Sequence, residues 1–435
     1  MKRGPKSLQV KFSGDRLTHF GGLYLLQKFF QRLDLRSLLS QYLPFRQRNN
    51  RYTVTEEVLS LIYPMALGLG RIETSHLLKQ NGVFQYLTGL PTYPNPTTLR
   101  RFLLRMAPLA LPKLRKLHDR FLLSMIRTPQ SPTQVIFDLD STVLTLYGKQ
   151  EMARIGYNPQ KWGRPSYHPL LCFNGITKDC WQAELRPGDT HTATGILELL
   201  REIFAKLPPS VKDISIRADK GFYDHKTVEY LESKKALFAI VAKLTQPIKK
   251  KLSNLPYHCY SSGTETGDFL YRPTGWGKEY RFIAIRRPIP EDPTEQLTLF
   301  SMGKYSYQVI VTNLNLIPLN LWKFYNGRAS VELIIKELKA DYPLGKIPTK
   351  YFAANAAYFH ILLFAYNLIN WFKRLCLPAE FQNMTLKTLR SRLLLIPGEL
   401  IKSGNRPTLK LPTTFLYRDA FEHAIKEIEK LKSNL

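Results

Sequence analysis

The stretch VIFDLDST, residues 135–142, constrains the fold most, because it places two acids on an otherwise apolar strand. Side chains two positions apart on a β-strand project from the same face, so Asp138 and Asp140 share one face. The other face is apolar and holds Val135, Phe137 and Leu139. Two carboxylates this close repel each other unless a cation lies between them or one is protonated. The stretch allows two chemistries: Asp138 as a nucleophile for phosphoryl groups, or Asp140 as a metal ligand.

The charge balance indicates a polyanionic partner. The 435 residues carry 63 Lys and Arg against 34 Asp and Glu, a formal net charge of +29. Nucleic acid is the first candidate, because each phosphate that is neutralised releases counterions and adds affinity. An anionic membrane surface is the second candidate. The hydrophobic content of 44% indicates a globular chain, long enough for two or three domains.

Targeting signals and cysteine spacing favour a cytoplasmic protein. Residues 1–12 are basic, but no apolar segment of a secretory signal follows them. The four cysteines show no CxxC spacing and are expected to be free thiols, namely Cys172, Cys180, Cys259 and Cys376. The apolar run 351–372 is about long enough to span a bilayer, but three asparagines and His360 interrupt it. We expect a buried core helix and no membrane partner.

Apolar periodicity divides the chain into regions. A basic, largely helical region precedes a linker over 128–134 that is rich in Pro, Thr and Ser. An α/β core is then predicted from five strands and one helix: strands over 135–140, 142–147, 168–174, 213–223 and 238–244, and a helix over 188–207. Residues 246–312 contain short alternating runs with turn residues between them, which predicts a β-rich insertion. The remainder is mostly helical and basic.

A second acid follows another predicted strand, in RADKGFY over residues 217–223. Asp219 follows the alternating run Ile214-Ser215-Ile216 of this strand and precedes Gly221. In open α/β sheets the functional crevice lies at the ends of the strands, so Asp219 is a candidate site residue. An equally good interpretation is a turn aspartate that caps the next helix.

A third acid lies in FYNGRASVELIIKELKADY, residues 324–342. Arg328, Glu332 and Lys339 lie 3, 7 and 14 positions beyond Tyr325, so the four project from one side of a helix with about 3.6 residues per turn. An acid flanked by Arg, Tyr and Lys suits a carboxylate that binds a metal beside a DNA phosphate. The alternative is an ordinary surface helix with an ion pair between Arg328 and Glu332.

Taken together, these residues resemble the bacterial insertion-sequence DDE transposases. Asp140, Asp219 and Glu332 look like the three acids, and Y-x2-R-x3-E-x6-K is similar to the signature of the group marked by Tyr-Arg-Glu-Lys. Two further runs are similar to that group, GYNPQKWGRPSYHPLLCF over 156–173 and LRPGDTHTATG over 185–195. The pattern departs at Lys220, where a small residue is expected.

The resemblance implies an α/β ribonuclease-H-like catalytic core interrupted by a β-rich insertion, with helical N-terminal and C-terminal regions. The expected parts are a DNA-binding region over 1–127, a core over 135–245 and 313–375, the insertion over 246–312, and a C-terminal region over 376–435. Asp140, Asp219 and Glu332 would hold two Mg²⁺ ions per active site, for which Mn²⁺ can substitute. Tyr325, Arg328 and Lys339 would contact DNA phosphates, and Trp276 would stack on an extruded base.

The implied activity is cleavage of double-stranded DNA at the terminal repeats of a mobile element and joining to target DNA. Two active sites working on two DNA ends imply a homodimer, and the implied location is the bacterial cytoplasm, at the nucleoid.

Two other functions compete with this interpretation. FDLDST also resembles the nucleophile loop of haloacid-dehalogenase-type phosphatases, with Asp138 attacking and Asp140 as acid and base. That family opens its catalytic domain with this motif, whereas here about 130 residues precede it, and the charge of +29 stays unexplained. The other alternative is a DNA-binding protein derived from a transposase without catalysis. The intact set of three acids argues against it.

Overall fold

The chain divides into two compact units. The computed structural model describes residues 10–12, 14, 16–45, 51–90, 92–126, 133–159, 161–260, 263–289, 300–302, 304–403 and 406–431. The first unit, here called the terminal unit, combines Met1–Leu103 with Leu368–Asn434, and the second, the sheet unit, spans Leu104–Asn367. Of the predicted linker 128–134, only residues 133 and 134 are among the described residues.

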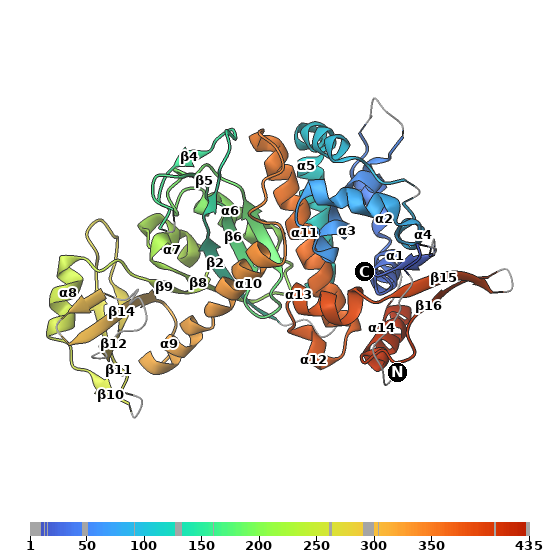
Figure 1. Ribbon diagram of the computed structural model, residues 1–435. Helices are drawn as coiled ribbons and strands as arrows, with labels where there is room; N and C mark the ends of the chain where they lie inside the picture. Colours follow the sequence, from blue (N-terminus) through green and yellow to red (C-terminus); the bar gives the residue numbers. More distant parts are fainter. Residues whose placement is uncertain are drawn as a thin grey trace. The chain divides into compact units, whose positions relative to one another are not determined.

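The sheet unit is built on a large mixed sheet (Figure 1). Its described strands are β2 (Gln134–Ser141), β6 (Leu170–Asn174), β7 (Cys180–Glu184), β8 (Asp213–Ala218), β9 (Leu237–Val241), β10 (His258–Cys259), β11 (Glu265–Tyr271), β12 (Tyr280–Pro288), β13 (Phe300–Met302) and β14 (Tyr305–Thr312). The strand order is β10-β11-β12-β14-β9-β8-β2-β6-β7, and β13 pairs with β14. Three short strands, β3 (Leu144–Thr145), β4 (Arg154–Ile155) and β5 (Pro165–Tyr167), form a separate sheet.

Strand β2 lies inside the large sheet, as its apolar face predicts. It pairs in parallel with β8 and antiparallel with β6. Val135, Phe137 and Leu139 are fully buried, and so is Asp138 on the opposite face. Strands β8 and β9 are also parallel to each other. The predicted mixed α/β architecture of this part of the chain is therefore present.

The segment predicted as a β-rich insertion, 246–312, extends the same sheet. It begins with helix α8 (Gln246–Ser253) and supplies strands β10 to β14. Strand β14 pairs with β9 through the register Val311↔Ile240, so the insertion is continuous with the core. Its apolar residues pack into one cluster with the core: Ala239, Ile283, Ile285, Ile310, Leu321 and Tyr325.

Several predicted elements are shorter than expected. The predicted strands 213–223 and 238–244 end at Ala218 and Val241, and two other elements differ more. The predicted strand 142–147 leaves the large sheet, because the Thr142 N–H donates to the Pro169 carbonyl and the Leu146 N–H to the Pro165 carbonyl. Only β3 remains of it. The predicted helix 188–207 begins at Ile196 as α6 (Ile196–Lys206), because turns over 188–195 end at Gly195 with a φ of 79°. A further helix, α7 (His225–Ser233), connects β8 and β9.

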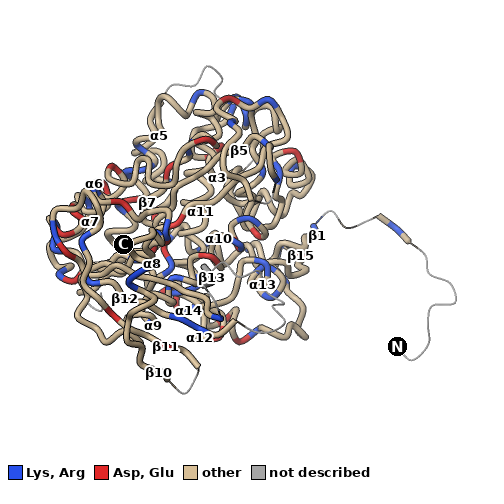
Figure 2. The backbone as a smooth tube through the Cα atoms, turned by 90° about the vertical axis from the view of Figure 1, so that its left-hand side faces the viewer, with Lys and Arg blue, Asp and Glu red and all other residues tan. Residues whose placement is uncertain are grey.

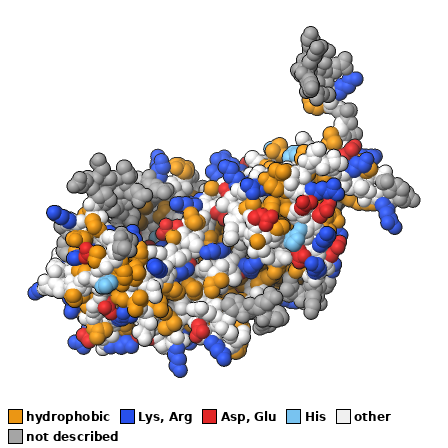
Figure 3. All heavy atoms as spheres, turned by 90° about the horizontal axis from the view of Figure 1, so that it is seen from below, with side chains coloured by type: hydrophobic (Ala, Val, Ile, Leu, Met, Phe, Trp, Pro, Cys, Tyr) orange, Lys and Arg blue, Asp and Glu red, His pale blue; other side chains and the backbone are white. Residues whose placement is uncertain are grey.

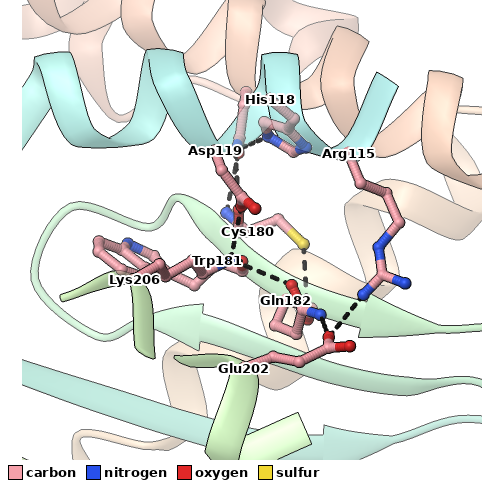
Figure 4. A network of polar contacts seen from close by, with 9 residues as sticks. Arg115, His118, Asp119, Cys180, Trp181, Gln182, Glu202 and Lys206 are labelled. Atoms are coloured by element: carbon pink, nitrogen blue, oxygen red, sulfur yellow. Dashed lines mark hydrogen bonds and ion pairs between the residues drawn. The ribbon is translucent and has the colours of Figure 1, made fainter. Parts of the chain in front are cut away.

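A polar network attaches helix α5 (Pro96–Ile126) to the sheet within the sheet unit, as Figure 4 shows. Lys206 of α6 donates to Asp119 at 2.7 Å and to Gln182 of β7 at 3.0 Å. Arg115 of α5 lies 2.6 Å from Glu202 of α6. The network holds α5, β7 and α6 together.

The predicted helix carrying Tyr325, Arg328, Glu332 and Lys339 is two helices. Helix α9 (Pro318–Asn326) ends at Gly327, and α10 (Ala329–Ala340) begins after Arg328. The N–H of Arg328 donates to the Tyr325 carbonyl, so the chain bends between the two helices. Tyr325 therefore lies on one helix, and Glu332 and Lys339 lie on the other.

The terminal unit joins both ends of the chain. Its helices are α1 (Leu23–Arg32), α2 (Leu35–Tyr42), α3 (Val54–Leu67), the 3-10 helix Ile72–Gln80, α4 (Gly82–Thr88), α12 (Ala379–Gln382), α13 (Leu386–Leu389), the π-helix Arg390–Leu394 and α14 (Arg418–Lys430). Its sheet contains β1 (Leu17–Thr18), β15 (Gly398–Ser403) and β16 (Arg406–Lys410), in that order. The C-terminal region, expected to be helical, therefore also contains a β-hairpin.

Helix α11 (Phe352–Cys376) is long and apolar enough to cross a membrane by length and composition. However, 78% of its most apolar window is buried inside the protein, in agreement with the predicted core helix. Its polar residues have partners: Asn367 donates to the Cys180 carbonyl at 2.8 Å and accepts from the Cys180 N–H at 2.8 Å. These bonds satisfy the backbone of the edge strand β7.

Candidate active site

One cleft in the sheet unit, with a volume of about 850 Å³, brings six of the seven predicted site residues together. They are Asp140, Asp219, Tyr325, Arg328, Glu332 and Lys339. The acids come from three elements: the end of β2, the turn after β8, and the first turn of α10. Asp140 and Asp219 are far apart in the sequence, but the sheet brings them together, because β2 and β8 are parallel neighbours that end at the same edge.

Asp140 is buried at the end of β2, with 9% of its surface exposed. Its Oδ1 accepts the Ser141 N–H at 2.8 Å and lies 3.1 Å from Nη2 of Arg328. Burial raises the pKa of Asp140 to about 6, against the effect of Arg328 and in the same direction as Asp219 and Glu332. Without a metal, the surroundings of Asp140 therefore disfavour its ionised form. A bound cation would offset this penalty.

Asp219 follows β8 and is held by a short local bond. The register places Ala218 of β8 opposite Leu139 of β2, so the residues that follow them, Asp219 and Asp140, lie side by side. The Asp219 Oδ1 accepts the Gly221 N–H at 2.8 Å. Asp219 therefore does cap a short 3-10 turn, as the alternative interpretation predicted, and it lines the cleft as well.

Arg328 links two of the three acids. The residue is 6% exposed, and its guanidinium lies 3.1 Å from Oδ1 of Asp140 and 3.4 Å from Oε1 of Glu332. Burial alone would lower the pKa of Arg328, but Asp140 and the other anionic neighbours raise it. The Glu332 side chain is 59% exposed. The ion pair predicted for an ordinary surface helix is present, but its arginine is buried against the cleft acids.

Tyr325 and Lys339 supply two further polar groups. Tyr325 is buried, and burial raises its pKa to about 12, so its hydroxyl stays protonated and can donate a hydrogen bond. The Lys339 Nζ donates to the Val143 carbonyl at 3.1 Å, and burial lowers the pKa of Lys339. Both side chains can donate to an oxyanion in the cleft.

Trp276 is the one predicted site residue outside the lining of the cleft. Its indole packs against three rings, Tyr223 at 5.2 Å, His225 at 5.3 Å and Tyr280 at 5.1 Å between centroids. The indole is only partly buried by these rings.

The acids fit a divalent metal by chemistry. Three carboxylates share one cleft, and carboxylate oxygen is the donor that Mg²⁺ and Mn²⁺ prefer. Over the described residues, however, no group of three or more His, Cys, Asp or Glu side chains is close enough to hold an ion as it stands. Instead, Oδ1 of Asp140 and Oε1 of Glu332 both pair with the guanidinium of Arg328.

Several cleft residues were not predicted as site residues from the sequence. Three lysines line the cleft, Lys220, Lys243 and Lys336. Ser141 also lines it and bonds to Nε2 of His168 at 3.0 Å, while the other ring nitrogen of His168 bonds to the Thr190 carbonyl. The only sequence signal for these residues is their position just beyond strand ends or one turn along α10.

The position of Asp138 distinguishes between the two chemistries that the sequence allowed, a nucleophile at Asp138 and a metal ligand at Asp140. Asp138 is fully buried, does not line the cleft, and accepts hydrogen bonds from Arg217 on both carboxylate oxygens. A nucleophile needs access to its substrate. The structure therefore argues against Asp138 as the nucleophile of a phosphatase.

The fold and cleft define a mixed α/β protein whose acidic site is bordered by cationic groups, an arrangement suited to phosphodiester substrates. A family model described as "Transposase DDE domain group 1" matches residues 2–433, and the chain belongs to this transposase family. A comparison with curated proteins found no match. Among solved structures, a cryo-EM structure of a piggyBac transposase synaptic complex with hairpin DNA is similar with a TM-score of 0.43 and 13% identity, over 86% of this chain and 79% of that one.

Proposed function

We propose that this transposase-family protein binds the ends of a mobile DNA element and catalyses metal-dependent DNA cleavage and strand transfer. The observation that carries the proposal is the convergence of Asp140, Asp219 and Glu332 in one cleft with Arg328, Tyr325 and Lys339. The three acids come from positions far apart in the chain, and the fold brings them to one cleft.

The acids would hold the metal, and the neighbouring groups would hold the DNA backbone. When bound to Asp140, Asp219 and Glu332, two divalent ions would supply activation of the attacking oxygen and stabilisation of the leaving oxygen. Arg328 offers a planar fork to phosphate oxygens, Lys339 offers a point charge, and the protonated Tyr325 hydroxyl donates a hydrogen bond. All three groups would orient the scissile phosphate, and Arg328 and Lys339 would also balance its charge.

The charge of the chain supports DNA as the substrate. Lys and Arg outnumber Asp and Glu by 63 to 34, and they occur along most of the described backbone (Figure 2). On the face seen in Figure 3, lysine and arginine side chains are scattered among hydrophobic and acidic ones. Lys220, Lys243 and Lys336 bring this positive charge into the cleft itself. In a complex, Trp276 would stack on an extruded base.

We also infer a ribonuclease-H-like core and membership of the bacterial insertion-sequence group. The strand order β7-β6-β2-β8-β9 supports a ribonuclease-H-like core, and the four residues of the Tyr-Arg-Glu-Lys pattern support the bacterial insertion-sequence group. A protein of this group would work as a homodimer on paired DNA ends, in the cytoplasm at the nucleoid.

A non-catalytic DNA-binding protein is the second candidate. It is favoured by the pairing of Arg328 with Asp140, which occupies the acid that would hold metal, and by Lys220 beside Asp219. Such a protein would bind the same DNA without cutting it.

The test uses labelled DNA from the flanks of the reading frame, with Mg²⁺ or Mn²⁺. We expect 3′-end cleavage and joining by the wild-type protein, loss of both in Asp140→Asn, and partial survival in Asp138→Asn. Binding of the DNA ends without cleavage under either metal would select the non-catalytic alternative. Phosphatase activity that disappears with Asp138→Asn, without any DNA binding, would overturn both.

A further inference from the structure

A buried ion pair lies directly behind the cleft. Asp138 of β2 and Arg217 of β8 face each other across the parallel register of the two strands. The Arg217 Nε donates to Oδ1 of Asp138 at 2.6 Å, and Nη2 donates to Oδ2 at 2.8 Å. The two side chains are 6% and 1% exposed for Arg217 and Asp138. Two parallel bonds of this kind fix the orientation of the guanidinium plane.

The same guanidinium also holds the end of a helix. The Arg217 Nη1 donates to the Phe324 carbonyl at 2.7 Å, and the guanidinium lies 5.3 Å from the centroid of the Phe324 ring. Phe324 is in the last turn of α9, where its carbonyl also accepts the Gly327 N–H at 3.3 Å and where a cation is favourable. One side chain therefore joins β2, β8 and α9.

The junction between α9 and α10 is shaped to admit this arginine. A Cβ on Gly327 would lie 2.2 Å from Nη1 of Arg217, although its φ of −55° is open to any residue. The adjacent Arg328 donates from Nε to the Leu139 carbonyl at 3.4 Å and pairs with Asp140. Two arginines thus attach the same junction to the same strand, one behind the cleft and one inside it.

We propose that Asp138 and Arg217 form a positioning pair that sets the junction of α9 and α10 against β2. The pair fixes where Tyr325, Arg328 and Glu332 lie relative to Asp140. Neither residue lines the cleft, so neither touches DNA. The inference rests on the proposed function for its effect on cleavage, but the structural coupling can be measured without DNA.

A purely structural role is the competing explanation. A buried ion pair is weak evidence for stability, because apolar replacements of similar volume often stabilise a protein as well. A positioning role predicts instead a local effect on the junction and a loss of rate with little loss of DNA affinity. The test therefore needs a readout at the junction.

The first variant is Gly327→Ala, which leaves both charges in place and pushes Arg217 away from the Phe324 carbonyl. Gly345→Ala is the matched control, because a Cβ there meets nothing within 4 Å. We expect Gly327→Ala to speed amide hydrogen exchange over residues 324–332 by ~10-fold, with the exchange of β6 and β7 unchanged. Cleavage of a pre-bound DNA end should slow by ~10- to 100-fold, with the Kd for that DNA within ~3-fold of wild type.

The second variant, Arg217→Lys, keeps the charge but cannot bond Asp138 twice and Phe324 at once. It should reproduce the local exchange signature and the slower cleavage. The proposal is overturned if both variants match Gly345→Ala, or if exchange accelerates uniformly across the sheet unit. Absence of cleavage by the wild-type protein would remove the proposed function, while the exchange data on DNA-free protein would still decide the role of the pair.

Discussion

Asp140 is the residue whose ionisation the protein opposes most clearly within the candidate site. Burial raises its pKa to about 6, Arg328 opposes this shift, and Asp219 adds to it. In the native state, Asp140 therefore keeps its proton up to a higher pH than the same side chain does in the unfolded chain. A bound cation would stabilise the ionised form of such an acid. The electrostatics of the cleft are therefore consistent with the proposed metal.

Metal-free wild-type protein should lose stability relative to Asp140→Asn as the pH rises from about 4 to about 6, because the native state binds more protons in that window. The difference should reach at most about 3 kcal/mol and stay constant at higher pH. Urea unfolding curves from pH 4 to pH 8 measure it. Glu198→Gln, on the exposed face of α6, is the control and should follow the wild type. A gap between wild type and Asp140→Asn that widens toward low pH would contradict this account of Asp140.

Arg328 should oppose metal binding in the absence of DNA, because its guanidinium pairs with Asp140. We expect Arg328→Gln to bind Mn²⁺ ~10-fold more tightly, since the anionic potential at the acids is no longer neutralised. The same variant should bind DNA ends more weakly. Calorimetric titration of DNA-free protein with Mn²⁺ tests the first effect, and unchanged or weaker Mn²⁺ binding would show that Arg328 does not compete.

At the scale of secondary-structure elements, local sequence chemistry is clearest at helix α3. The Thr53 side chain accepts the Glu56 N–H at 3.1 Å, and Glu56 accepts the Thr53 N–H at 2.7 Å, which is a complete capping box. Thr53→Ala should lower the unfolding free energy by about 1 kcal/mol, and Glu56→Gln should lower it much less, because glutamine also completes the box. Equal losses in thermal denaturation would mean that the cap is not the source of the effect.

The elements also show where sequence reasoning succeeds. Alternation placed β2 and its buried face correctly, because the side-chain period of a strand is a local property. The break between α9 and α10 was missed, because it depends on Gly327 and on Arg217, which lies more than a hundred residues earlier. The acids and their neighbours on α10 could be named from spacing and resemblance. Lys243, just beyond β9, and Lys336 of α10 could not be named, since only the tertiary fold brings them to the cleft.

At the scale of the whole molecule, the main difference from the sequence-based expectation is the terminal unit. Residues near the two ends of the chain pair directly, as in β1 with β15 through Leu17↔Glu399. Arg390 donates to the Ala66 carbonyl at 3.0 Å, close to the end of α3. Such contacts cannot be read from local periodicity, because they join residues several hundred positions apart.

A fragment of residues 1–127, the region expected from the sequence to bind DNA, should not fold by itself. It would expose the buried Phe29, which packs on Phe372, and it would lack the partner strand of β1. We expect a poorly dispersed NMR spectrum for the fragment. A well-dispersed spectrum with cooperative unfolding would show that the N-terminal region is independent of the C-terminal one.

If Asp140 binds a catalytic metal, exchanging its carboxylate for a thiolate should change which metal supports cleavage. Thiolate is a poor ligand for Mg²⁺ and a better one for softer ions such as Mn²⁺. The measurement is the rate of DNA-end cleavage by Asp140→Cys in Mg²⁺ and in Mn²⁺, relative to the wild-type rate in each metal. We expect Asp140→Cys to lose cleavage activity by at least ~1000-fold in Mg²⁺ and to recover part of it in Mn²⁺. Cleavage in Mg²⁺ at a rate close to wild type would contradict metal binding by Asp140.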